Sequence, residues 1–477
     1  MADTRHDPLS FVRPAGPVIG IKPLAPSDAL ATPLDDAPSA APLSSNPVSA
    51  MALSANMVEM SLPGRPADRN GPNTTAARCY DARVTQSGPI LGSTRLTEEQ
   101  VLLREAVRVL ADERVAPRAA EIDRDGAFPE DLRRLLAEQD VFAIPFAERH
   151  GGLGADLLTL VLAIEQLSRA CATTGLILAV QALGATPIQM AGTPEQQDRW
   201  LPGLASGEKL IAFGLTEPDA GSDPSGIRTR AVRDGDDYVI DGGKRFISHA
   251  SVADYVVVFA VTNPGAEKPS RRLSAILVET DRPGFAVTRV EHKMGLRGSP
   301  TAELAFDGLR VPVANRLGEE GQGFAIAMKT FERSRPGIAA QAVGIAQGAV
   351  EAAAAYANQR RQFGHPIAEL QMVQALLADM DAATEAARQL LYTACAEIEA
   401  GGGEAARWAA IAKLVAGDTA MRVTTDAVQV FGGYGYTEDF PVERMMRDAK
   451  ITQLYEGTQQ IQRLIVARSL AARAPAL

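Results

Sequence analysis

The pattern of hydrophobic and polar residues changes along the chain and divides the sequence into four parts. From about residue 93 to 210, hydrophobic residues recur every three or four positions, which is typical of amphipathic helices. The first helix should begin at residues 97–100, Thr-Glu-Glu-Gln, a capping box followed by Leu103, Val107 and Leu110 on one face. Further helices are predicted over 130–140, 156–171, 176–190 and 194–204. Residues 93–210 are therefore expected to form an α-helical domain.

The hydrophobic period then changes from that of helices to that of strands. Between residues 211 and 318, short runs rich in β-branched and aromatic residues alternate with turn signals such as Asp234-Gly235 and Asp241-Gly242-Gly243. The predicted strands are 228–233, 238–241, 245–248, 255–262, 273–279, 285–290 and 302–306. This central part is expected to be a β-barrel or a β-sandwich.

From residue 319 to 477 the pattern is helical again and rich in alanine. Long helices are predicted over 338–358, 371–399 and 405–431, and a last one begins near Thr458. Long helices with short connections pack as antiparallel bundles, so a four-helix bundle is expected. The wide apolar faces of these helices suggest burial in an oligomer.

Residues 1–92 have a different composition from the rest. They contain 13 of the 30 prolines, but Phe11 and Tyr80 are their only aromatic residues. Such a segment buries too little apolar surface to offset its ordering entropy, so a disordered leader is predicted. Its aspartates argue against a mitochondrial transit peptide, which is poor in acidic residues. The alternative is that translation starts at Met51, Met57 or Met60.

Composition excludes several classes of function. The net charge is −10 at pH 7, which disfavours binding to nucleic acid or to an anionic membrane. The richest apolar stretch, near residues 176–188, is interrupted by polar residues, glycine and proline, so no membrane span is predicted. The three cysteines are far apart, and the histidines have no metal-ligand spacing. Neither a disulfide framework nor a tightly bound metal is expected.

Three short motifs combine residues that are able to bind a cofactor or do chemistry, and each also has a purely structural explanation. The polar loop 213–222 is suited to a phosphate or a ring edge, or is a plain surface loop. Glu456 precedes a capped helix. It is either a functional carboxylate or a carboxylate that only complements the dipole of that helix. Arg360 and Phe363 are suited to a phosphate and a flat ring, or simply end a helix.

Taken together, the motifs resemble one family. From about Thr97 to Arg468 the chain resembles the acyl-CoA dehydrogenases, including the block Leu215-Thr-Glu-Pro-Asp-Ala-Gly-Ser-Asp223. The seven matching blocks lie at residues 215–223, 243–248, 293–301, 335–340, 360–364, 429–435 and 446–458. The resemblance implies a helical domain, a β domain and a C-terminal four-helix bundle. It also implies a homotetramer with one FAD per subunit.

The resemblance further assigns residues to the cofactor, the substrate and the base. It implies FAD contacts from Phe213, Leu215, Thr216, Ser222, Phe246, Ile247, Ser248, Arg360, Phe363, Gln429, Gly432, Gly433, Thr458 and Gln460. Arg360 and Phe363 would reach the FAD of a neighbouring subunit. It implies thioester contacts from Ser222, Glu332, Arg335 and Gly457.

By the same resemblance, Glu456 removes the α-proton while the β-hydride passes to flavin N5, which gives a trans-2-enoyl-CoA. Some relatives take their base from the position of Ser334, but serine cannot serve as a base. The sequence departs from the family pattern at Asp219, Phe246 and His249, where many relatives have glycine, tryptophan and asparagine.

The implied partners are an acyl-CoA substrate and an electron-transfer flavoprotein that accepts the electrons, and the expected location is the cytoplasm. Three alternatives use the same fold: an acyl-thioester oxidase, a flavin monooxygenase, and a dehydrogenase of carrier-protein thioesters. The sequence does not specify the acyl chain.

Overall fold

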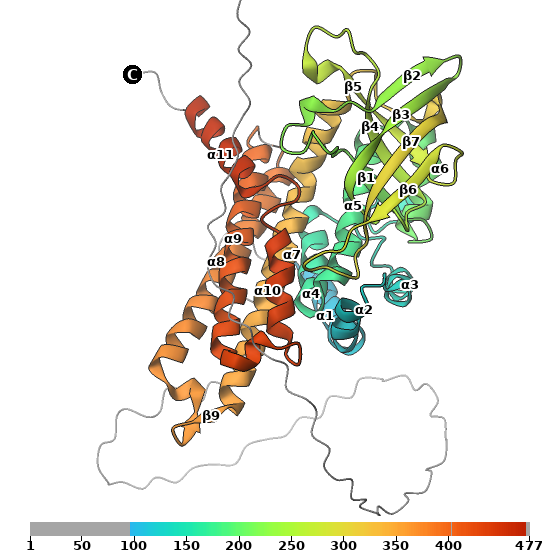
Figure 1. The fold of residues 1–477 in the computed structure, drawn as a ribbon. Coiled ribbons are helices and arrows are strands. Elements are labelled where there is room, and N and C mark those ends of the chain that lie inside the picture. Colours follow the sequence, from blue (N-terminus) through green and yellow to red (C-terminus); the bar gives the residue numbers. More distant parts are fainter. Residues whose placement is uncertain (1–95, 402, 474–477) are drawn as a thin grey trace, which may run out of the picture. The chain divides into compact units, whose positions relative to one another are not determined.

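The computed structural model describes residues 96–401 and 403–473, and the proline-rich stretch 1–92 lies outside them. Along the described chain, helices come first, then a β-sheet, then helices again (Figure 1). This order confirms the predicted fold class, in which a helical part, a central β part and a helical bundle follow one another.

The first helical part begins where the capping box predicts. Thr97 Oγ1 accepts a hydrogen bond from the backbone N–H of Gln100, and the Gln100 side chain accepts one from the N–H of Thr97. The helices of this part are α1 (Glu98–Leu110), α2 (Ala119–Asp125), α3 (Glu130–Glu138), α4 (Leu157–Ala170), α5 (Ala172–Ala191) and α6 (Pro194–Ala205).

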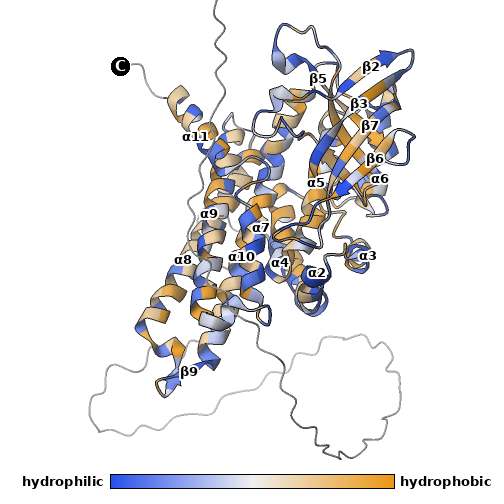
Figure 2. Cartoon of the chain, viewed as in Figure 1, coloured by the Kyte–Doolittle hydropathy of each residue, from blue (hydrophilic) through white to orange (hydrophobic). Residues whose placement is uncertain are grey.

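Two helices are long and apolar enough to cross a bilayer, namely α5 and, in the C-terminal part, α7 (Gly323–Gln359). Figure 2 shows hydrophobic residues over most of α5. In both helices, however, 72% of the apolar window is buried inside the protein. Their hydrophobicity is therefore accounted for by packing in the core, as the sequence predicts for residues 176–188.

The central part is one eight-stranded sheet with the order β6-β7-β3-β2-β4-β5-β8, in which β1 also pairs with β4. Its two halves meet at a single residue pair, Arg230↔Val261. The strands are β1 (Ile211–Gly214), β2 (Arg230–Asp234), β3 (Asp237–Ser248), β4 (Tyr255–Val261), β5 (Leu273–Glu279), β6 (Phe285–Val290), β7 (Thr301–Pro312) and β8 (Arg316–Leu317).

One predicted turn is wrong. Asp241-Gly242-Gly243 does not separate two strands, because β3 runs continuously through it and pairs with β7 across an irregularity between Ile240 and Gly242. Gly242 has φ +136°, and a Cβ there would lie 2.8 Å from the Cα of Thr229. The glycines therefore permit a β-bulge and a close approach of two backbones, which sequence alone does not distinguish from a turn.

The C-terminal part is built around three long helices, and two of them have the predicted bounds. They are α7 (Gly323–Gln359), α8 (Gln371–Glu399) and α9 (Ala405–Phe431), with the short hairpin β9 (Arg361–Gln362) and β10 (His365–Pro366) between α7 and α8. The helices α10 (Pro441–Ile451) and α11 (Gln459–Arg473) follow and pack against α9.

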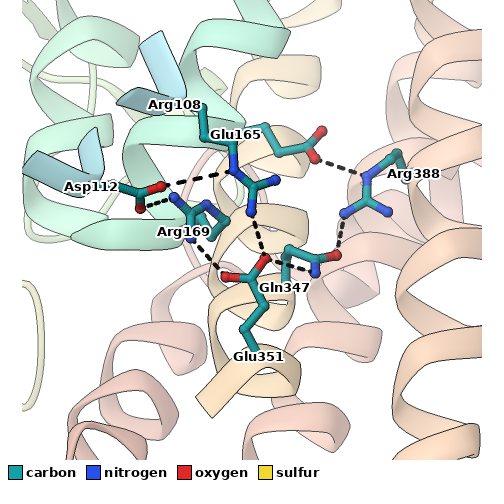
Figure 3. Close-up of polar contacts among 7 residues, drawn as sticks. All are labelled: Arg108, Asp112, Glu165, Arg169, Gln347, Glu351 and Arg388. Atoms are coloured by element: carbon teal, nitrogen blue, oxygen red, sulfur yellow. Dashed lines mark hydrogen bonds and ion pairs between the residues drawn. The ribbon is translucent and has the colours of Figure 1, made fainter. Parts of the chain in front are cut away.

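An ionic network joins the first helical part to the bundle (Figure 3). The carboxylate of Glu165 on α4 is 2% exposed; it accepts hydrogen bonds from Arg388 Nε at 2.8 Å and from the Tyr392 hydroxyl at 3.0 Å, both on α8. On the same helix, Arg169 pairs with Asp112 and with Glu351 of α7. The network fixes the position of α4, which also lines the cavity described below.

Candidate active site

Glu456 lies in the short segment between α10 and α11, and its environment is unusual for a carboxylate. Its backbone is left-handed, with φ +52°, and its side chain is half-buried. Oε2 accepts a hydrogen bond of 2.6 Å from the hydroxyl of Ser334 on α7. Burial raises the pKa of Glu456 above its usual value, against the opposing effects of the Ser334 hydrogen bond and of the charges of Arg335 and Lys413. A carboxyl group whose pKa is raised in this way is a stronger base than a solvent-exposed one and is suited to proton transfer.

The main chain around Glu456 is held by cations. Arg335 Nε donates to the Glu456 carbonyl at 3.2 Å, and Lys413 Nζ donates to the Gly457 carbonyl at 2.7 Å. Gln462 Nε2 donates to both carbonyl oxygens, at 3.1 and 2.9 Å. Gly457 has φ +95°, and a Cβ there would lie 2.7 Å from Gln462 Nε2, so glycine is required. As the sequence predicts, Thr458 immediately precedes α11, where its Oγ1 accepts from the Ile461 N–H.

Lys413 makes folding stability depend on pH. Its side chain is 1% exposed, and its pKa is lowered from 10.5 to about 7. Burial is the main cause and Arg335 adds to it, whereas Glu456 and Asp418 oppose it. Between these values the unfolded chain binds a proton that the folded chain lacks, so Lys413 makes folding more favourable as pH rises. We expect the stability of the wild type relative to Lys413→Met to rise between pH 7 and 9, by at most about 1.4 kcal/mol per pH unit. Chemical unfolding of both proteins at several pH values measures this difference. If the free energies of unfolding of the two proteins changed equally with pH, the expectation would be contradicted.

A small cavity of about 60 Å³ is connected to this carboxylate through Ser334, which lines the cavity and donates to Glu456. It lies between α4, α5 and α7, and Ser334 forms part of its wall. The lining includes Leu160, Ile164, Ala179, Leu183 and Gly337. At Gly337 an added Cβ would lie 3.3 Å from Ile164 Cδ1, so α4 and α7 approach closely there. Polar side chains complete the lining, among them Asp156, Gln189 and Arg333, so the wall between α4 and α7 is the apolar part of the cavity.

The predicted cofactor loop 213–222 is anchored by a buried ion pair. Lys244 on β3 is 1% exposed and donates to Glu217 Oε1 at 2.7 Å, and also to the carbonyls of Phe259 and Leu215. The Glu217 carboxylate also accepts the N–H groups of Arg228 and Thr229. Burial lowers the pKa of Lys244 to about 8. Burial also opposes ionisation of Glu217, but the attraction of Lys244 holds the pKa of Glu217 below its usual value.

This loop and the end of β3 lie side by side, as the sequence predicts. The Arg245 N–H donates to the Thr216 carbonyl at 2.9 Å, which places Thr216 beside residues 246–248. Phe246 is 58% exposed with φ +59°, so its ring is available to a ligand. Leu215 and Ile247, by contrast, have side chains buried in the core, which leaves only their main chains for such contacts.

Phe213 connects this loop to Glu456. Its ring centroid lies 5.5 Å from that of Phe331 on α7, and the guanidinium of Arg335 lies 5.4 Å from the Phe331 ring. Arg335 in turn contacts the Glu456 carbonyl. Of the predicted substrate residues, Arg335 and Gly457 lie at Glu456, and the half-buried Glu332 lies near Arg335. Ser222, by contrast, is exposed on the loop.

A separate group of predicted cofactor residues, made of Arg360, Phe363, Gln429, Gly432 and Gly433, lies at the end of the bundle that carries β9, whereas α11 with Gln460 lies at the other end (Figure 1). Arg360 lies over the Tyr434 ring at 5.5 Å, which places it near Gly432 and Gly433. Phe363 is 85% exposed, with φ +53°. Gln429, Gly432 and Gly433 are exposed too, and so is Gln460 on α11.

These surfaces fit a dinucleotide with a flat ring. An exposed aromatic ring, Phe246, stands beside a loop with free hydroxyls, and a Cβ added at Gly432 or Gly433 would meet no atom within 4 Å. Within the part of the chain that the structure describes, no three His, Cys, Asp or Glu side chains are grouped to hold a metal ion. Cys171 and Cys395 are free and buried.

The sequence analysis did not single out Glu217, Lys244 or Lys413. A signal was present for the first two, since each lies inside a family block and Lys244 occupies an inward position of β3. No local pattern marks Lys413, because a lysine in an alanine-rich helix is ordinarily exposed.

Comparisons with known proteins agree with this geometry. Three family models match: "Acyl-CoA dehydrogenase, N-terminal domain" at residues 97–208, "middle domain" at 212–309 and "C-terminal domain" at 321–471. The short-chain-specific acyl-CoA dehydrogenase of Clostridium acetobutylicum is 48% identical over 78% of this chain and 98% of the relative.

Two solved structures are similar as well. Butyryl-CoA dehydrogenase from Megasphaera elsdenii has a TM-score of 0.77 and 42% identity, over 80% of this chain and 100% of that one. A second chain has a TM-score of 0.77 and 45% identity, over 79% of this chain and 98% of that one. It comes from a structure described as "Electron transferring flavoprotein of Acidaminococcus fermentans: Towards a mechanism of flavin-based electron bifurcation".

The chain therefore belongs to the acyl-CoA dehydrogenase family. It is an FAD-dependent oxidoreductase that carries out the α,β-dehydrogenation of acyl-CoA thioesters. This confirms the family, cofactor and reaction that the motifs imply.

Proposed function

We propose that Glu456 is the base of this dehydrogenation and that the substrate has a short acyl chain. The observation that carries the proposal is the position of the carboxylate: it is held by Ser334 at the wall of a cavity of about 60 Å³. An α-proton next to a thioester is weakly acidic, so its removal needs a carboxylate of raised pKa and a polarised carbonyl.

The main chain at Glu456 is suited to polarise that carbonyl. Within residues 96–401 and 403–473, the backbone N–H of Glu456 donates to no other atom. A thioester oxygen in front of it would receive a hydrogen bond while Glu456 Oε1 takes the α-proton, as in an oxyanion hole. The cations on the carbonyls of Glu456 and Gly457 fix the orientation of these peptide groups. FAD, when bound, supplies the hydride acceptor for the β-carbon.

The size of the cavity supports a short acyl group. Its volume of about 60 Å³ is less than half of the roughly 150 Å³ cavity that accommodates benzene in another protein. Two similar proteins, named short-chain-specific and butyryl-CoA dehydrogenase, support the same substrate class. Anaerobic bleaching of the flavin by acyl-CoAs of increasing length tests the proposal, and butyryl-CoA should be a better substrate than octanoyl-CoA.

Ile164 should set the length limit, because it is fully buried at the α4 side of the cavity. Ile164→Ala removes three carbons, and we expect kcat/KM for octanoyl-CoA relative to butyryl-CoA to rise at least about tenfold. Leu162→Ala is a suitable control, because Leu162 is equally buried on α4 but does not line the cavity. Both changes should cost about 2–5 kcal/mol of stability. An unchanged ratio in Ile164→Ala would place the acyl group elsewhere.

We further propose a homotetramer in which Arg360 and Phe363 contact the FAD of a neighbouring subunit. Support comes from Phe363, an exposed aromatic ring at the hairpin, and from the separation of β9 from β3, the strand that carries Phe246 (Figure 1). Arg360→Ala should therefore lower FAD affinity and loosen the assembly while leaving the chemical step nearly unchanged. Equilibrium dialysis measures the FAD affinity and sedimentation measures the assembly. If both were normal in the variant, Arg360 would have only the structural role of ending α7.

An electron-transfer flavoprotein is the proposed electron acceptor, supported by the similar chain from the Acidaminococcus fermentans study. The oxidase and monooxygenase alternatives predict rapid peroxide formation or substrate oxygenation in air, whereas a dehydrogenase reduces the partner flavoprotein and yields little peroxide. Repeating the assay with the same acyl group on CoA and on a carrier protein shows which thioester is preferred. We propose a cytoplasmic location, supported by the acidic residues of the first 36 positions.

A further inference from the structure

The hydroxyl of Ser334 has a different partner from the hydroxyls of three threonines in the bundle helices. Thr330 on the same helix, Thr384 on α8 and Thr424 on α9 each donate to the backbone carbonyl four residues earlier, at 2.7–2.8 Å. That is the usual local partner of a hydroxyl inside a helix. Ser334 instead donates across the site to Glu456 Oε2, 122 residues away, at 2.6 Å.

The contact distinguishes the two oxygens of the carboxylate. Oε2 accepts the Ser334 hydroxyl, whereas Oε1 has no hydrogen-bond partner among the residues that the structure describes. Ser334 itself lines the cavity, so the anchored oxygen marks the cavity wall. A half-buried carboxylate with one oxygen held has lost most of its rotational freedom about the last side-chain bond.

The neighbouring cations do not take this role. Arg335 Nε and Lys413 Nζ bind the carbonyls of Glu456 and Gly457, and neither forms an ion pair with the carboxylate. A direct ion pair would orient the carboxylate but would also make it a much weaker base. A neutral hydroxyl orients it at a smaller cost in basicity.

From this geometry we propose that Ser334 is a positioning residue for the base: its hydroxyl holds Glu456 Oε2 at the cavity wall and leaves Oε1 to accept the α-proton. The proposal rests on the proposed role of Glu456 as the base. It gives a function to the position where serine cannot itself be a base.

The charged and titratable groups that face Glu456 are few. Arg335 comes from α7, Lys413 from α9, and Tyr455 precedes it in the chain, with its hydroxyl bonded to Gln341. Since burial brings the pKa of Lys413 to about 7, Lys413 also titrates near neutrality. The test must therefore compare variants that leave Arg335, Lys413 and Tyr455 intact.

The experiment measures the rate of anaerobic flavin reduction by saturating butyryl-CoA between pH 5 and 9. The proteins are the FAD-loaded wild type, Ser334→Ala, Ser334→Thr and Ser168→Ala. Removing a hydrogen-bond donor to the ionised carboxylate raises the pKa of that carboxylate. In Ser334→Ala, the pH at which the rate of flavin reduction falls on the acidic side should therefore rise by about one pH unit. The rate at pH 7 should fall about tenfold. Ser334→Thr keeps the hydroxyl and should therefore have the pH profile of the wild type and its rate at pH 7.

Ser168→Ala is the matched control, because its buried hydroxyl on α4 has no hydrogen-bond partner in the described chain. It should keep the wild-type pH profile. A wild-type profile in Ser334→Ala, or a threonine variant that behaves like the alanine variant, would overturn the inference. Normal reduction by Glu456→Gln would instead overturn the assignment of the base, so the two failures are distinguishable.

Discussion

Replacing Glu456 by glutamine is expected to slow flavin reduction by acyl-CoA about 10²- to 10⁴-fold. Glutamine keeps the size of the side chain and can still accept the Ser334 hydroxyl, but it has no basic oxygen to take the α-proton. Because removal of the proton and of the hydride are coupled, we expect a loss near the upper end of that range. FAD content and acyl-CoA binding should remain close to those of the wild type.

Stopped-flow measurement of anaerobic flavin bleaching by butyryl-CoA gives the rate, and thermal melting shows whether the variant is folded. Glu303→Gln is a suitable control, because it neutralises another half-buried carboxylate, one that lies in the central sheet. If Glu456 only complemented the dipole of α11, the variant would show a small change in stability and nearly normal turnover. Nearly normal bleaching would therefore exclude Glu456 as the base.

The second large effect is on stability, at the ionic network between α4 and α8 (Figure 3). Arg388→Met removes the guanidinium that donates to Glu165 at 2.8 Å, while Glu165 itself remains 2% exposed. A buried carboxylate without its cation is strongly unfavourable, so we expect the free energy of unfolding to fall by about 3–5 kcal/mol. Chemical denaturation of the FAD-loaded protein at a fixed concentration measures this change.

Two further variants show whether the loss comes from the unpaired charge. The double variant Glu165→Leu/Arg388→Met removes both charges and should recover much of the loss, because no ion is then left buried alone. Arg108→Met affects a more exposed member of the same network, 3.8 Å from Asp112, and should cost at most about 1 kcal/mol. Equal losses in Arg388→Met and in Arg108→Met would contradict the argument.

The network also has a consequence for the substrate. Glu165 follows Ile164 directly in α4, so the ion pair holds the wall of the cavity against α7 and α8. Arg388→Met should therefore weaken discrimination between butyryl-CoA and octanoyl-CoA, even though Arg388 does not line that cavity.

Local sequence patterns determined most of the secondary structure. The capping box at Thr97 located the start of α1, and alanine-rich stretches bounded by glycine and proline breaks gave the bounds of α8 and α9. Each of these patterns involves residues only a few positions apart in the sequence, so it can be recognised without knowing the fold. The exception was Gly242-Gly243, where the same glycines serve a turn or a bulge and only the approach of Thr229 decides between them.

The sequence also determined the family and singled out Glu456, because each motif block is a contiguous stretch and the seven blocks together resemble one family. What surrounds Glu456 was decided only by the tertiary structure. Ser334, Lys413 and Glu456 come from three separate segments, and no periodicity links them. Ser334 received no role from the sequence because serine is not a base, whereas the fold brings its hydroxyl to Glu456, the proposed base. The partners of a buried polar group are set by packing between distant segments, and a linear pattern does not encode that packing.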